Sequence, residues 1–98
     1  MSYGEDSKRR DRHEIVVAIL KSAMDGKVKT HIMYKAKLSY AQLNEYLPLL
    51  VEKGFVENTL VKHRKNYKKI FKTTLKGMQF LEKIESINEL WVPATETF

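Results

Sequence analysis

The strongest apolar pattern in the chain lies between Ser39 and Gly54. Four apolar residues there recur at i, i+3, i+4 and i+7, which is the spacing of one helical face. They are Leu43, Tyr46, Leu47 and Leu50. Ser39 can cap the first turn with Gln42 completing a capping box, and Gly54 can close the last turn in the left-handed conformation. We therefore predict a helix over residues 39–53, whose opposite face is free to contact something other than the core.

Two further helices are predicted before this one. Helical periodicity begins at Glu14, and the pair Asp25–Gly26 ends the first helix. Residues 27–29 are predicted to form a short extended bridge, after which Thr30 can cap a short helix. Only residues 36–38 then precede the cap at Ser39. Two helices joined by so tight a turn are typical of a helix-turn-helix.

Beyond Gly54 the apolar period changes from that of a helix to that of strands. Segments 55–61 and 67–74 are rich in β-branched and aromatic residues, and the polar segment 62–66 between them predicts a hairpin with a basic tip. Thr74 is predicted to cap a last helix over about residues 75–91, which Pro93 ends. This order of elements predicts a winged helix-turn-helix, an α+β fold that is mostly α.

The length of 98 residues predicts one domain. We assign residues 13–92 to it, with 1–12 as a disordered or basic arm and 93–98 as a loose tail. The chain has no cysteine and no apolar stretch of the ~20 residues that a membrane span needs. These features predict a soluble protein of a reducing cytoplasm.

The formal net charge of +6 is concentrated in one segment of the chain. Between residues 62 and 76 there are seven cations and no acid, so the remainder of the chain sums to −1. The cations are Lys62, Arg64, Lys65, Lys68, Lys69, Lys72 and Lys76. Such clustering favours a polyanionic partner, and the alternative is a solvated lysine-rich surface.

Five short segments resemble, in order and spacing, the archaeal winged-helix DNA-binding proteins, which are small basic dimers exemplified in Sulfolobus. The segments are Thr30–Tyr34, Leu38–Tyr40, Tyr46–Leu47, Lys53–Gly54 and Thr74–Gly77. The resemblance implies an archaeal, nucleoid-associated protein that binds duplex DNA as a homodimer. It would act as a transcriptional regulator or as a chromatin-associated factor.

A departure from the usual chemistry of DNA reading shapes the predicted interface. No lysine or arginine lies between Ser39 and Glu52, so the predicted helix lacks the side chains that most often read guanine. Polar residues of this helix would contact DNA, cations of the wing and of the helix-turn-helix junction would supply affinity, and sequence preference would be weak. The predicted set is Lys35, Lys37, Ser39, Tyr40, Gln42, Asn44, Lys62, Arg64, Lys65, Lys68 and Lys69.

The last helix carries more apolar residues than a small domain usually buries. These residues are Phe80, Ile84, Ile87, Leu90 and Trp91, and we predict that they form a two-fold dimer interface. The alternative to DNA binding is a winged-helix protein-interaction module, in which the acidic face around Glu45 and Glu52 meets a partner. A third hypothesis is a chromatin protein that binds DNA without sequence preference.

Catalytic and cofactor chemistry find no support in the sequence. His13, His31 and His63 are far apart and have no carboxylate or second histidine at ligand spacing, so no metal site is predicted. No nucleophile is paired with a base, and the four isolated glycines form no phosphate-binding loop. We therefore predict no enzyme activity and no cofactor, and no small-molecule ligand is evident from the sequence.

Overall fold

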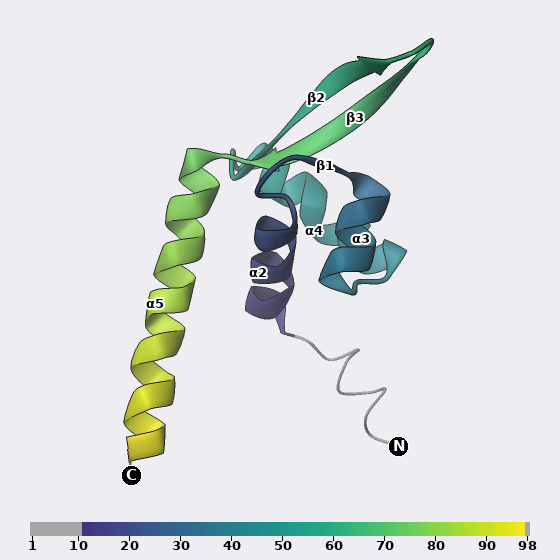
Figure 1. Ribbon diagram of the computed structural model, residues 1–98. Helices are drawn as coiled ribbons and strands as arrows, with labels where there is room; N and C mark the ends of the chain where they lie inside the picture. Colours follow the sequence, from purple (N-terminus) through teal and green to yellow (C-terminus); the bar gives the residue numbers. More distant parts are fainter. Residues whose placement is uncertain (1–10, 98) are drawn as a thin grey trace, which may run out of the picture.

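The computed structural model describes residues 11–97, with side chains up to Ile87 (Figure 1). Residues 1–10 of the predicted arm therefore lie outside the described residues. The elements follow the predicted order, and the extended bridge predicted at residues 27–29 forms a short strand over residues 27–28. They are α2 (Arg12–Ser22), β1 (Lys27–Val28), α3 (Lys29–Ala36), α4 (Tyr40–Glu52), β2 (Val56–His63), β3 (Asn66–Thr73) and α5 (Leu75–Thr97).

Both ends of α4 form as the sequence predicts. The Gln42 backbone N–H donates to Ser39 Oγ at 3.0 Å, and the Ser39 N–H donates to Gln42 Oε1 at 2.9 Å. Gly54 has a φ of +82°, the left-handed region where a side chain would be strained. The apolar stripe faces the core through Leu43, Leu47 and Leu50. Pro48 is exposed on the opposite face, which is therefore free as predicted.

The prediction that Thr30 caps α3 is wrong. This helix begins at Lys29, and its N-cap is Val28, which makes no side-chain cap hydrogen bond. The reason is tertiary, because residues 27 and 28 form strand β1 and pair with Phe71 and Ile70 of β3. The chain thus passes from a strand directly into the helix, which leaves Thr30 exposed within the first turn.

The sheet has the order β1-β3-β2 and is antiparallel throughout. Strands β2 and β3 form the wing, which projects away from the helices in Figure 1. Its turn consists of Arg64 and Lys65 alone, with Arg64 at a φ of +60°. The predicted loop 62–66 is therefore too long, since Lys62 pairs with Tyr67 inside the ladder. A two-residue turn with positive φ matches the twist of the paired strands, so pairing continues almost to the tip.

The predicted end of the last helix at Pro93 is also wrong. Helix α5 continues through Pro93 to Thr97, so the expected loose tail is helical over residues 93–97. An internal proline removes one backbone donor and costs about 3 kcal/mol. A proline therefore ends a helix only where the helical turn that follows it stabilises the helix by less than this cost. Residue 98 lies outside the described part of the chain.

The start of α5 is fastened to the turn between α4 and β2. Thr74 Oγ1 accepts from the Gly77 N–H at 3.0 Å, which confirms the predicted cap, and donates to the Gly54 carbonyl at 2.7 Å. Phe55 and Phe80 stack with ring centroids 4.4 Å apart. These contacts hold the base of the wing in a defined position relative to α4.

Strand β3 is also tied to the end of α2. The buried Thr73 hydroxyl donates to the Leu20 carbonyl at 2.7 Å, and the Thr73 N–H donates to the Ala23 carbonyl at 2.9 Å. Both bonds satisfy carbonyls near the C-terminus of a helix, where no intrahelical partner remains. The sheet base is thereby attached to the helical core from two sides.

Candidate nucleic-acid interface

The two faces of the wing differ in their surroundings. Residues that are paired across an antiparallel ladder share a face, and successive residues alternate between faces. The inner face, which packs on the helices at its base, carries Val56, Asn58, Leu60 and Lys62 of β2 opposite Thr73, Phe71, Lys69 and Tyr67 of β3. The outer face carries Glu57, Thr59 and Val61 opposite Lys72, Ile70 and Lys68.

The structure therefore divides the predicted cations of the wing. Lys62 and Lys69 lie on the inner face, Lys68 lies on the outer face, and Arg64 and Lys65 form the tip. All five are exposed. Sequence position alone suggested one patch, but adjacent strand residues such as Lys68 and Lys69 cannot face the same partner surface.

Two exposed apolar residues lie among the inner-face cations. Leu60 is 65% exposed and Tyr67 is 63% exposed. Leu60 pairs with Lys69 and Tyr67 pairs with Lys62, so the two apolar side chains are diagonal neighbours on one face. The inner face near the tip thus offers both charge and apolar surface.

The polar residues predicted to read DNA are only partly free. Ser39 Oγ and Gln42 Oε1 both accept hydrogen bonds within the capping box. The side-chain amide nitrogen of Gln42 can still donate a hydrogen bond to DNA. Tyr40 is 65% exposed at the first turn of α4. Lys35 in the last turn of α3 and Lys37 at its C-cap are both exposed, and Lys37 adopts a φ of +57°.

Lys29 is a member of this surface that sequence reasoning missed. Its ammonium group donates to Asn44 Oδ1 and lies 5.1 Å from the centroid of the Tyr40 ring. Tyr40 and Asn44 are one turn apart on α4, so the spacing of these two was visible in the sequence. Lys29 is 15 residues from Asn44, however, and only the fold brings them together.

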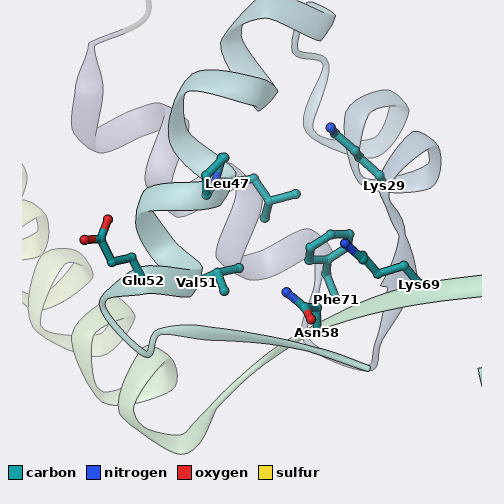
Figure 2. Close-up of a pocket in the computed structure, with 8 residues that line it drawn as sticks. Lys29, Leu47, Val51, Glu52, Asn58, Lys69 and Phe71 are labelled. Atoms are coloured by element: carbon teal, nitrogen blue, oxygen red, sulfur yellow. The ribbon is translucent and has the colours of Figure 1, made fainter. Parts of the chain in front are cut away.

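A cleft joins the outer part of α4 to the inner face of the wing (Figure 2). Leu47, Pro48 and Val51 line it from α4. Asn58, Lys69 and Phe71 line it from the wing. The free surface of α4 and the inner face of the wing therefore border one concavity.

The predicted dimer residues do not form a single exposed stripe. Phe80 is half-buried against Phe55, and Ile84 is 8% exposed, so both pack within this chain. Ile87 is 55% exposed. The side chains of Leu90 and Trp91 lie outside the described residues.

Comparison with known proteins agrees with this architecture. A family model described as winged helix-turn-helix matches residues 9–91. The chain belongs to the winged helix-turn-helix family. This winged-helix protein is 32% identical over 88 residues to the uncharacterized protein MJ0290 of Methanocaldococcus jannaschii. The alignment covers 89% of this chain but only 38% of that relative.

Two solved structures share the winged-helix arrangement. Sso10a-2, a DNA-binding protein from Sulfolobus solfataricus, is 26% identical with a TM-score of 0.67, over 90% of this chain and 92% of that one. A PadR-like transcription factor from Bacteroides fragilis is 20% identical with a TM-score of 0.68, over 97% and 99% of the two chains. The second similarity concerns the fold alone. The predicted fold and the resemblance to archaeal winged-helix proteins are thus confirmed.

Within the described part of the winged-helix protein, no three histidine or acidic side chains come together in a way that could hold a metal ion. No helix in that part is both long and apolar enough to cross a membrane.

Proposed function

We propose that this protein binds duplex DNA as a nucleoid-associated transcriptional regulator. Helix α4 enters the major groove, and the inner face and tip of the wing lie along phosphates. The observation that carries the proposal is the shared concavity between the free surface of α4 and the cationic inner face of the wing. The DNA-binding description of Sso10a-2 supports it.

Affinity in this arrangement comes chiefly from phosphate contacts. Lys62, Lys69 and the tip residues Arg64 and Lys65 face the duplex, whereas Lys68 on the outer face makes no contact. Base reading falls to Tyr40, the Gln42 amide nitrogen and Asn44, because α4 has no lysine or arginine. Without a bidentate arginine the discrimination between base pairs is weak.

The two faces of the wing allow a charge-matched test. Lys62→Ala with Lys69→Ala removes two inner cations, and Lys68→Ala with Lys72→Ala removes two outer ones. We expect the inner variant to bind random duplex more weakly and to lower the slope of log K against log salt by about 0.9 for each lost contact. The outer variant should keep a slope near that of the wild type. Fluorescence anisotropy at several salt concentrations measures both.

Equal slopes for the two variants would contradict the assignment of the inner face. Absence of binding at low salt would contradict DNA binding itself. It would favour the second candidate, a protein-interaction module, for which Glu45 and Glu52 on the exposed face of α4 are the supporting observation.

We further propose that the protein acts as a homodimer through α5. The 23 residues of this helix span about 35 Å. Its C-terminal part extends past α2 in Figure 1, and exposed Ile87 lies on it, followed by apolar Leu90 and Trp91 at helical spacing. A two-fold dimer would present two copies of α4 to successive grooves about 34 Å apart.

A further inference from the structure

The cleft between α4 and the wing has the size and lining of a small-molecule site. Its volume is about 350 Å³, within the range of ordinary ligand pockets. Leu47, Val51 and Phe71 provide an apolar floor, and Pro48 adds to one wall. Apolar surface of a ligand that contacts these residues is removed from water, which is favourable in proportion to the area covered.

Two cations stand at the edge of this apolar floor. Lys29 borders the cleft from the start of α3, and Lys69 borders it from β3. Figure 2 shows the Lys69 side chain extending over the cleft toward Phe71. The Glu52 carboxylate lies at the far side and points away from both lysines.

No acid whose side chain the structure describes forms an ion pair with either lysine. Among residues whose side chains the structure describes, the ion pairs are Lys21 with Glu85 and Lys27 with Asp25. Lys29 donates to the neutral Asn44 amide oxygen instead, so its charge remains available to an anion. Cations beside apolar surface, with no acid paired to them, favour an amphipathic anion over a neutral ligand.

We propose that this cleft binds a small organic anion that has an apolar ring and a carboxylate. The ring packs on Leu47, Val51 and Phe71, and the carboxylate meets Lys29 and Lys69. Inorganic phosphate fits less well, because apolar side chains cannot replace the hydration that a bare anion loses.

Occupation of the cleft opposes DNA binding. The ligand engages Lys69, which the proposed function assigns to a phosphate. Its carboxylate also competes with Asn44 Oδ1 for the Lys29 ammonium, since a charge-assisted hydrogen bond is the stronger one. The effect of the ligand on DNA binding rests on the proposed function, whereas ligand binding by itself does not.

Ligand binding is tested first without DNA. The full chain labelled with ¹⁵N is titrated with indole-3-acetate, with its neutral alcohol analogue tryptophol, and with inorganic phosphate. We expect indole-3-acetate to bind in the millimolar range or tighter, at least tenfold better than the other two, and to shift the amides of Val51, Asn58 and Lys69. Absence of binding at millimolar concentration, or equal binding of tryptophol or phosphate, would overturn the proposal.

A matched pair of variants then locates the site. Asn58 and Thr59 are adjacent, exposed residues of β2 that lie on opposite faces of the wing. Asn58→Phe fills the cleft, whereas Thr59→Phe places the same ring on the outer face, and both suit a strand. We expect Asn58→Phe to lose at least tenfold in affinity for indole-3-acetate while Thr59→Phe retains it. Equal affinities would place the ligand elsewhere and overturn the proposal.

The final measurement adds duplex DNA. Indole-3-acetate should weaken DNA binding of the wild type and of Thr59→Phe, and should leave Asn58→Phe unaffected. Equal weakening of all three proteins would contradict regulation through the cleft. Ligand binding by a protein that binds no DNA would uphold the site and overturn the proposed function, so the two failures are distinguishable.

Discussion

At the scale of single residues, the fold depends on a few places where one atom decides the geometry. Gly77 is the clearest of them. A Cβ atom at this position would lie 2.1 Å from the Phe55 carbonyl oxygen and 2.9 Å from Thr73 Cγ2. The glycine therefore lets α5 approach the start of β2 more closely than any other residue would.

Replacing this glycine tests whether the close approach matters. Alanine is the better helix former by about 1 kcal/mol, so propensity alone predicts that Gly77→Ala stabilises the protein. The clash is with backbone, which cannot move aside cheaply, and we expect a net loss of about 2 kcal/mol in the free energy of unfolding. Urea denaturation measures the loss, with exposed Gln79→Ala on the same helix as a near-neutral control. A stabilised Gly77→Ala protein would contradict the packing described for α5.

At the scale of elements, the wing is a two-faced ribbon rather than a charged loop. Strand pairing runs as far as His63 and Asn66, so side-chain alternation is maintained almost to the tip. Leu60 and Tyr67 are exposed on the same face as Lys62 and Lys69. Apolar residues beside cations suit contact with the sugars and bases of a groove as well as with phosphates.

The apolar pair of the wing should contribute affinity that salt does not screen. We expect Leu60→Ser with Tyr67→Ser to weaken binding to duplex DNA at least tenfold at every salt concentration, since burying one such side chain is worth about 1.5–3 kcal/mol. The salt slope should stay unchanged, because no counterion release is lost. Val61→Ser on the outer face is the control. A loss as large for Val61→Ser would contradict the orientation of the wing.

At the scale of the whole molecule, α5 links the DNA-facing elements to the proposed dimer. Its first turns are bonded to the turn between α4 and β2, and Glu85 pairs with Lys21 of α2 at 2.6 Å. The helix then continues through Pro93 to Thr97. A partner bound near its C-terminal half would therefore be held rigidly relative to α4.

Exposed Ile87 offers a test of this assembly. We expect the wild type to sediment as a dimer at micromolar concentration and Ile87→Glu to sediment as a monomer, because a charge buried at an apolar interface is costly. Ser86→Glu adds the same charge at the adjacent exposed position and should leave the dimer intact. DNA affinity should fall only for Ile87→Glu, which can no longer engage two half-sites. A monomeric wild type would exclude the dimer.

Local signals in the sequence were sufficient to predict the order and kind of the main elements, though not all of their ends. The capping box of Ser39 and Gln42, the left-handed Gly54 and the cap at Thr74 each act within four residues of chain, so the sequence displays them directly. The change of apolar period after Gly54 likewise identified the wing. Together these signals predicted the winged helix-turn-helix.

Tertiary structure decided everything that depends on contacts between distant segments. Pairing of β1 with β3 displaced the start of α3, and the strand register separated Lys68 from Lys69. The meeting of Lys29 with Asn44 and the cleft beside Pro48 exist only once α3, α4 and the wing are packed together. The physical reason is that caps and periods arise from neighbours along the chain, whereas a binding surface arises from residues that are neighbours only in space.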